Sequence, residues 1–215
     1  MSTAFTGWPV EALDFYRGLE ADNSKAFWAE HKHVYETSVL EPMEALLGDL
    51  AEEFGEARVF RPYRDIRFSA DKSPYKTAIG ATLASGGYVQ LSARGLGVGA
   101  GCHMMAPEQL ARFRSAVADD RAGAALVGAI AEVEDGGVDV TTRERLKRVP
   151  RGFDAEHPRA DLLRDKDLAA WKDWPVEPWL HTEAAEQHVF EVLRASRPLT
   201  DWLDAHVGPA TAAVR

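Results

Sequence analysis

The apolar positions of the first third of the chain recur at the spacing of α-helices. Leu13 and Leu19 belong to one such apolar stripe, which ends before a polar pair. Ser24 is a residue type that caps helix N-termini, so we expect a second helix to begin directly after it. Pro42 suits the first turn of a third helix, and Gly55 suits its end. The predicted helices therefore cover residues 9–22, 25–35 and 41–54.

The pattern then shortens to the two-residue period of β-strands. Strands are expected at residues 59–60, 65–68, 78–83, 88–93 and 96–102. Arg94-Gly95 is a short turn that favours an antiparallel hairpin. Glycine occupies every other position from Gly97 to Gly101, which leaves one strand face without side chains. Such a face predicts close packing under a helix, with close approach of a flat ligand as the alternative.

Helical spacing returns in the second half of the chain, at residues 107–118, 120–134, 182–195 and 199–206. The stretch between them, residues 136–178, is less regular and has room for one or two short strands. Helices followed by consecutive strands and then by helices predict an α+β fold rather than alternating βαβ units. We expect a single domain over residues 1–215, in which an antiparallel sheet of central strands at about residues 58–105 is covered by N- and C-terminal helices.

Composition narrows the function classes. Of 215 residues, 46% are hydrophobic and 27% charged, which are the proportions of a globular protein. Acidic residues number 34 against 25 Lys and Arg, and the net charge of −9 disfavours a nucleic-acid coat or a binder of anionic membranes. One cysteine and seven scattered histidines lack the spacing of a metal site, and no cofactor is identified. The N-terminus does not resemble a secretory signal and no apolar run is long enough to span a membrane, so we expect a cytoplasmic protein.

A basic island interrupts this acidic chain. Residues 58–77 carry a net charge of +4, which leaves −13 for the rest. If residues 59–69 form a strand, successive side chains alternate between its two faces. One face would hold Arg61, Tyr63, Asp65, Arg67 and Ser69, and the other Phe60, Pro62, Arg64, Ile66 and Phe68. Pro62 can interrupt the strand and shift this alternation upstream of it.

The hydrogen-bonding face suggests an anion site. Arginines beside an aspartate suit bidentate binding of phosphate or carboxylate groups. Asp65 would orient Arg67 or act as a base, and the turn that follows would return Tyr75 towards the strand. The candidate catalytic residues are Asp65 and Tyr75, and the candidate ligand-binding residues are Arg61, Arg64, Arg67, Ser69, Lys72 and Lys76. A solvated sheet face with interleaved ion pairs is the alternative.

The run RDIRFSADKSPYKT, from Arg64 to Thr77, resembles the central motif of a bacterial family of uncharacterised proteins catalogued as domain of unknown function 2461. An upstream segment, PVEALDFYRGLEADNSKAFWAEHKHVYE from Pro9 to Glu36, resembles the same family. The likeness covers nearly the whole chain. It implies one globular domain and no particular reaction.

Two function classes fit these residues. The first is a protein with a cationic pocket for a small phosphate- or carboxylate-bearing ligand, with arginine-stabilised transfer or hydrolysis if it is an enzyme. The second is a non-catalytic interaction module that docks an acidic protein partner through the same Arg/Lys face. Local RNA binding, with Tyr63 and Tyr75 stacking on bases, is disfavoured by the overall charge.

Overall fold

The computed structural model describes residues 4–67 and 69–211. By its internal contacts the chain divides into two compact units. The first contains Met1–Val98 and Asp173–Glu191, and the second contains Gly99–Lys172 and Val192–Arg215. The single domain expected over residues 1–215 stays a prediction.

The first three α-helices of the chain begin close to where the local sequence predicts. They are α1 (Val10–Ala21), α2 (Lys25–Val34) and α3 (Glu41–Phe54). Ser24 Oγ accepts a hydrogen bond from Phe27 N at 3.1 Å, which confirms the predicted N-cap of α2. Gly55 follows α3 with a φ of +78°, a conformation that side chains disfavour, and thereby ends the helix.

A turn of π-helix, η1 (Tyr35–Leu40), joins α2 to α3, where the sequence predicts two separate helices. Pro42 has no N–H, and its ring clashes with the carbonyl four residues back in a regular helix. The preceding turn widens, and Glu41 N donates to the carbonyl of Glu36, five residues back. The helical chain therefore continues through the proline without a break.

Six strands form one antiparallel sheet in the order β1-β2-β3-β4-β6-β5. With the helices around it, the sheet confirms the predicted α+β fold. The strands are β1 (Ala57–Val59), β2 (Ala78–Leu83), β3 (Gly87–Ser92), β4 (Gly95–Cys102), β5 (Asp139–Thr141) and β6 (Leu168–Trp174). The hairpin between β3 and β4 was predicted to turn at Arg94-Gly95. It turns one residue earlier, at Ala93 and Arg94, because Gly95 already pairs as the first residue of β4.

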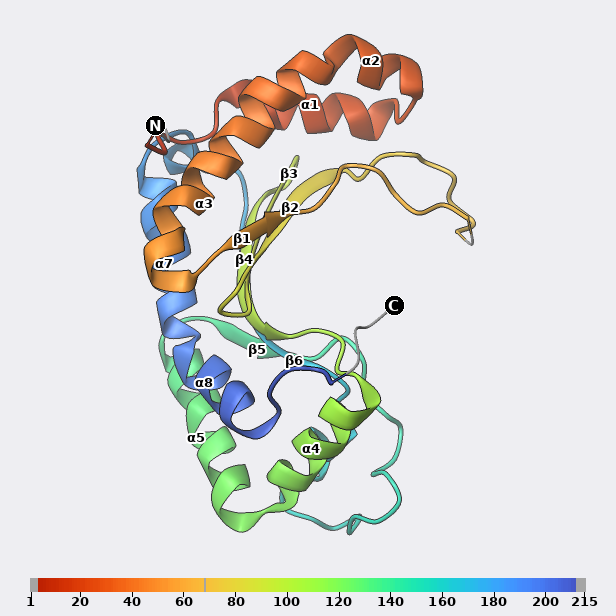
Figure 1. Ribbon diagram of the computed structural model, residues 1–215, viewed down its shortest axis with the longest axis vertical. Helices are drawn as coiled ribbons and strands as arrows, with labels where there is room; N and C mark the ends of the chain where they lie inside the picture. Colours follow the sequence, from red (N-terminus) through yellow and green to blue (C-terminus); the bar gives the residue numbers. More distant parts are fainter. Residues whose placement is uncertain (1–3, 68, 212–215) are drawn as a thin grey trace. The chain divides into compact units, whose positions relative to one another are not determined.

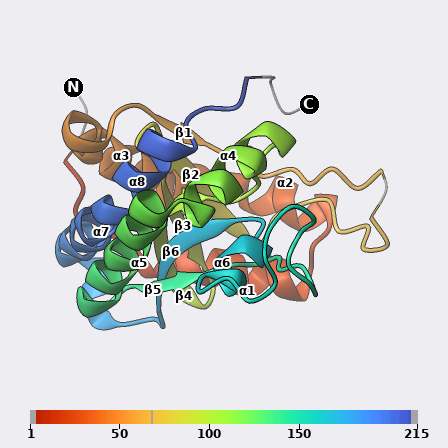
Figure 2. The same cartoon turned by 90° about the horizontal axis from the view of Figure 1, so that it is seen from below.

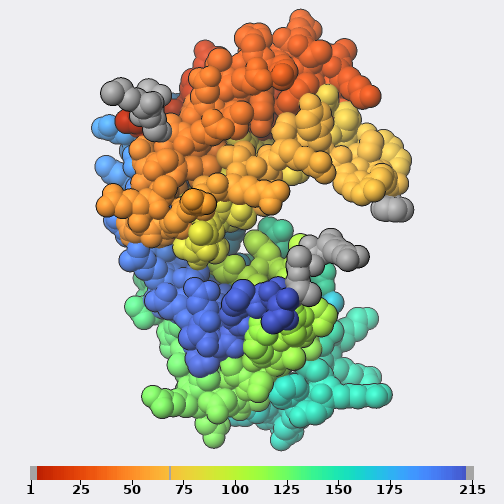
Figure 3. Space-filling view, in the orientation of Figure 1, coloured from red at the N-terminus to blue at the C-terminus, as the bar shows by residue number. Residues whose placement is uncertain are grey.

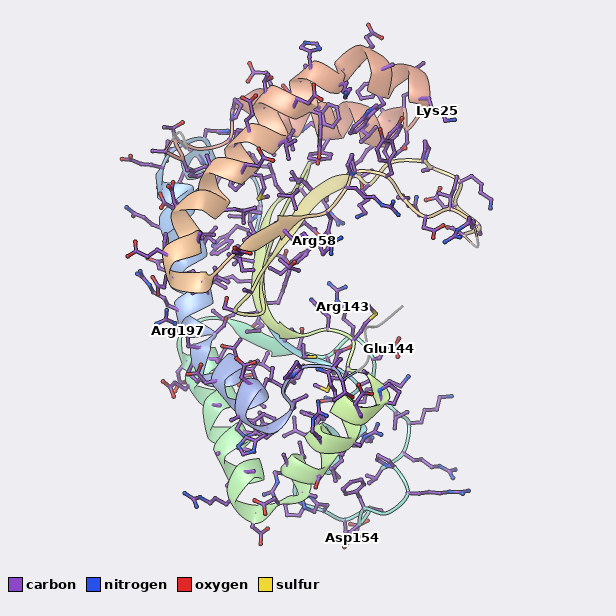
Figure 4. The ribbon with its side chains drawn as sticks, in the orientation of Figure 1. Lys25, Arg58, Arg143, Glu144, Asp154 and Arg197 are labelled. Atoms are coloured by element: carbon purple, nitrogen blue, oxygen red, sulfur yellow. The ribbon has the colours of Figure 1, made fainter. Side chains whose placement is uncertain are left out.

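The two faces of β2 and β3 differ in polarity. Odd-numbered side chains such as Ile79, Val89 and Leu91 are buried in the core of the first unit. Even-numbered positions lie on the opposite face, where Gly80 pairs with Gln90. Figure 1 shows α3 on one side of this part of the sheet, and Figure 4 shows side chains on both sides of it, with Arg58 labelled.

The alternating glycines of β4 serve close packing, as predicted, but against a strand rather than a helix. A Cβ atom at Gly99 would lie 2.4 Å from the carbonyl oxygen of Ala170. One at Gly101 would lie 2.5 Å from the carbonyl oxygen of Leu168. Glycine is therefore needed here because the backbone of β6 approaches β4 too closely for side chains.

Residues 60–67 and 69–77 form an arm that extends from β1 and β2, in gold in Figures 1 and 3. The strand predicted at residues 65–68 is wrong for the part described, since the arm contains only one β-bridge among the described residues, between Tyr63 and Tyr75. Two backbone hydrogen bonds flank it, from Arg64 N to Pro74 O at 2.9 Å and from Lys76 N to Pro62 O at 2.8 Å. Pro62 has no N–H to donate to a longer ladder.

The predicted alternation of faces holds from residue 61 to residue 67 but is wrong at Ser69. Side chains 61, 63, 65 and 67 are exposed, and side chains 62, 64 and 66 are half-buried. Ser69, predicted on the exposed face, is half-buried, because its N–H donates back to the carbonyl of Ile66 at 3.4 Å and the chain bends there. Phe68, predicted to lie on the apolar face, is outside the described residues. Extended backbone with little pairing is enough to keep this two-residue period.

The remaining helices include α4 (Pro107–Ala118), α5 (Asp120–Asp135), α6 (Ala160–Arg164), η2 (Pro178–His181), α7 (Ala184–Ala195) and α8 (Arg197–His206). Figure 2 shows α5 beside α8, and the indole of Trp202 donates to Ala122 O at 2.9 Å between them. The irregular stretch of residues 136–178 contains the short strands β5 and β6, as predicted. Over residues 4–67 and 69–211, no helix combines the length and apolar character that crossing a membrane requires.

Candidate ligand-binding site

A cavity of about 740 Å³ lies between the arm, the turn from α1 to α2, and the polar face of β2 and β3. This volume is within the range of small-molecule sites. Its walls come from three parts of the first unit. They are Glu20 and Asn23; Phe60, Arg64, Asp71, Ser73, Tyr75, Lys76 and Thr77; and Ala78, Gly80, Tyr88, Gln90, Ser92 and Arg94.

The floor of the cavity depends on a glycine. Tyr88 lies across the sheet, and its hydroxyl donates to Gln90 Oε1 at 3.0 Å. A Cβ atom at Gly80 would lie 2.5 Å from that hydroxyl oxygen, which is closer than real contacts allow. Gly80 therefore lets Tyr88 cover the strand and places a hydroxyl and an amide side by side.

Asn23 fastens the arm to the helices. Its Nδ2 donates to Tyr75 O at 3.1 Å, and its Oδ1 accepts from Tyr75 N at 3.0 Å. The Tyr75 ring stacks on Trp28 with centroids 4.3 Å apart and planes 8° apart. Tyr75 is only 5% exposed, and burial raises the pKa of its hydroxyl. Tyr75 thus anchors the arm while it also forms part of the cavity wall.

Arg64 lines the cavity, and its positive charge is paired with a carboxylate of the same arm. Its guanidinium pairs with Asp71, which also accepts hydrogen bonds from Ser73 N at 2.9 Å and Ser73 Oγ at 2.7 Å. The hydrogen bond from Arg64, followed by those from Ser73, holds the pKa of the Asp71 carboxyl well below its usual range. Asp71 therefore stays ionised and orients Arg64.

Lys76 lies in the cavity wall without a counterion. It is half-buried, and no carboxylate in the described part of the chain is within ion-pair distance of its Nζ. The ammonium instead lies 5.1 Å from the ring centroid of Phe60. Burial, and after it the positive charge of Arg61, lowers the pKa of Lys76. The Lys76 ammonium therefore has no negative charge beside it to offset its lost hydration, and a bound anion would supply one.

Arg94 is a second cation on the same wall. It follows Tyr88, Gln90 and Ser92 at two-residue intervals, and like them it lines the cavity. Its side chain is exposed and has no ion pair with any residue that the structure describes. A further hollow of about 340 Å³ shares Gln90, Ser92 and Arg94 with the cavity, which leaves room for an extended ligand.

Asp65 and Arg67 form a separate pair on the exposed side of the arm. Arg67 donates to both carboxylate oxygens, from Nε at 2.9 Å and from Nη2 at 2.6 Å. The two side chains are 49% and 76% exposed, respectively. The side-chain hydrogen bond from Arg67 lowers the pKa of Asp65 to about 2. A carboxylate with that pKa is a weak base at neutral pH.

The structure thus separates the predicted site residues into those that line the cavity and those that do not. Arg64, Tyr75 and Lys76 line the cavity. The others lie on the arm outside its lining: Arg61, Asp65, Arg67, Ser69 and Lys72. Among these, Lys72 donates from Nζ to the carbonyl of Ile66 at 3.0 Å. Their functional roles stay predictions.

Sequence reasoning missed the contribution of β3. Tyr88, Gln90 and Ser92 alternate with the buried Val89 and Leu91. A polar residue at every second position of a strand indicates one face outside the core. That signal was available in the sequence, whereas the contribution of the α1–α2 turn depends on contacts between distant segments.

Within residues 4–67 and 69–211, no three His, Cys, Asp or Glu residues lie close enough together to hold a metal ion. The cavity instead offers hydroxyls, an amide and cations. This chemistry suits a polar ligand with at least one negative charge.

Fold and site together define an α+β protein whose antiparallel sheet presents one polar face to a cavity of ligand size. The family described as conserved hypothetical protein (DUF2461) matches residues 11–202. The chain belongs to this family, as the run from Arg64 to Thr77 indicates. Comparisons with curated proteins and with solved structures found no match.

Proposed function

We propose that the protein binds a small phosphate- or carboxylate-bearing ligand in the cavity on the polar face of β2 and β3. The anionic group would contact Lys76 and Arg94, with the Asp71-paired Arg64 beside it. The observation that carries this proposal is Lys76, a half-buried ammonium without a carboxylate partner in the described chain.

Burial without a counterion is unfavourable for a charged group, and the lowered pKa of Lys76 reflects it. A bound anion reverses this effect, because it replaces lost hydration with a charge-assisted hydrogen bond. Arg94 adds a guanidinium that can bind phosphate or carboxylate through two parallel hydrogen bonds. The hydroxyl and amide of Tyr88 and Gln90 can position the rest of the ligand.

The proposal concerns binding, in the cytoplasm, and catalysis on the ligand remains a prediction. Transfer or hydrolysis at a phosphoryl or acyl centre would need a proton acceptor near the anion. Tyr75 has a raised pKa and Asp65 a lowered one, so neither shift favours proton removal at neutral pH. Arg64, Lys76 and Arg94 would instead stabilise developing negative charge.

The test compares two lysines of the same arm. Wild-type protein is screened by thermal shift against phosphorylated and carboxylated metabolites, and each hit is titrated by calorimetry. Lys76→Gln removes one of the three cations that line the cavity, and Lys72→Gln is its matched control outside the lining. A ligand at about a hundred times its Kd stabilises the folded state by roughly 2.7 kcal/mol, which moves the melting temperature measurably.

We expect Lys76→Gln to weaken binding by about tenfold or more, the loss of one charge-assisted contact, while Lys72→Gln binds as wild type. The absence of any hit for the wild type would contradict the proposal. Equal losses in both variants would contradict the assignment to this cavity, since they would indicate non-specific attraction to the basic arm.

The second candidate function is docking of an acidic protein partner through the outer side of the arm. It is supported by the exposure of Tyr63, at 49%, and by the exposure of Arg61 and Arg67, none of which lines the cavity. Arg67→Glu would then abolish capture of a partner while ligand binding is unchanged, because Arg67 is 76% exposed and lies outside the cavity lining. If Arg67→Glu retains every partner that the wild type captures, this candidate is wrong.

A further inference from the structure

Five charged side chains line the cavity, and two of them neutralise each other. Arg64 and Asp71 form an ion pair. Lys76 and Arg94 are cations without a carboxylate partner among the described residues, and Glu20 is a carboxylate without a cationic one. The unmatched charges are therefore two positive and one negative.

Glu20 occupies a position that its own helix disfavours. Glu20 is in the last turn of α1, and this turn contains no basic residue. The carbonyl end of a helix carries partial negative charge, so a carboxylate there is unfavourable. Within residues 4–67 and 69–211, the Glu20 carboxylate has no hydrogen bond or ion pair that would offset its unfavourable interaction with the helix end. The stability of α1 therefore does not account for a glutamate at this position.

We propose that the ligand is a zwitterion, with its anionic group at Lys76 and Arg94 and an ammonium group at Glu20. The class is an anionic head on a short amine-bearing chain, such as an aminoalkyl phosphate or an amino dicarboxylate. Two negative charges and one positive charge on the ligand match the unmatched charges of the lining. This inference rests on the proposed function and adds that the anionic ligand also carries an amine group.

The amine is tested with compounds that differ only in that group. Calorimetric titrations compare O-phosphoethanolamine with ethyl phosphate, and aspartate with succinate, on wild-type protein. We expect the amine-bearing member of at least one pair to bind about threefold to fivefold more tightly, the effect of one solvent-accessible ion pair. Glu20→Gln should bring this ratio close to one without weakening the amine-free compound.

Glu11→Gln, in the first turn of the same helix and outside the cavity lining, is the matched control and should keep the wild-type ratio. If ethyl phosphate or succinate binds in a Lys76-dependent way but the amine adds nothing, the zwitterion inference is wrong and the anion site stands. An amine effect that survives Glu20→Gln would also overturn it. If none of the four compounds binds the wild type, the class proposed here is wrong, and the broader metabolite screen decides separately whether the anion site exists.

Discussion

Asn23 holds the backbone of Tyr75 with two hydrogen bonds, from Nδ2 to Tyr75 O at 3.1 Å and from Tyr75 N to Oδ1 at 3.0 Å. An asparagine side chain thereby pairs with the arm as a neighbouring strand would. The contact joins the turn between α1 and α2 to the arm across 52 residues of sequence. It directly connects two walls of the cavity.

Asn23→Ala should loosen the arm more than it destabilises the whole protein. It leaves a buried carbonyl and amide of Tyr75 without partners, at a cost of about 1–3 kcal/mol. Hydrogen exchange should become faster at the amides of Tyr75 and Lys76 than at those of β3. Equal acceleration throughout the first unit would contradict a local role, and unchanged exchange at Tyr75 would contradict the hydrogen bonds themselves.

Gly80→Ala should displace Tyr88, because the new Cβ would lie 2.5 Å from the Tyr88 hydroxyl oxygen. Overpacking of this kind typically costs about 1–3 kcal/mol. Tyr88→Phe removes the clashing atom, so the double variant should recover most of that loss. Urea denaturation of the four proteins gives the coupling energy. Simply additive effects would show that Tyr88 does not cover Gly80.

Stability should fall as acid protonates Asp71. Its folded-state pKa is held below the ordinary value of 3.8, first by Arg64 and then by Ser73. The stabilisation is therefore complete above about pH 4 and is lost as the pH falls through the lower folded-state value. Asp71→Asn should be less stable than wild type at pH 7, and this deficit should shrink towards pH 2. Thermal melts across that range measure it, and a constant deficit would contradict the ion pair with Arg64.

Arg145→Ala should destabilise the second unit. Asp165 is 1% exposed and accepts from Arg145 Nε at 2.5 Å and Nη2 at 3.2 Å. Loss of one partner of a fully buried ion pair costs about 3–5 kcal/mol, and because Arg145 is 43% exposed we expect a smaller loss of about 1–3 kcal/mol. Burial raises the pKa of Asp165 even beside Arg145, and it would rise further without that partner.

The loss in Arg145→Ala should therefore depend on pH. A carboxyl whose folded-state pKa is raised above the ordinary value of 3.8 is more compatible with the fold when protonated, so the deficit should shrink as the pH falls from 8 to 4. Adding Asp165→Asn should restore part of the stability, because the buried charge is then removed. Denaturant melts at both pH values test this, and an equal deficit at each would contradict a buried, unpaired carboxylate.

Local patterns in the sequence determined most of the secondary structure. Ser24 and Gly55 predict helix ends correctly because a cap depends on a few neighbouring residues. The strand β2 has the predicted bounds, since the two-residue alternation is a local signal. The basic island, which is visible from composition alone, contains Arg64 and Lys76, and the structure places both in the cavity lining.

The tertiary structure decided which of those charges share a cavity. The arm stays mostly unpaired because Pro62 lacks an N–H and because Asn23 and Trp28, from outside the arm, hold Tyr75. This anchoring leaves Asp65 and Arg67 outside the lining of the cavity that contains Lys76. Glu20 and Arg94 join the same cavity through contacts between segments far apart in the chain. Such contacts depend on how helices pack against a sheet, and no local pattern encodes them.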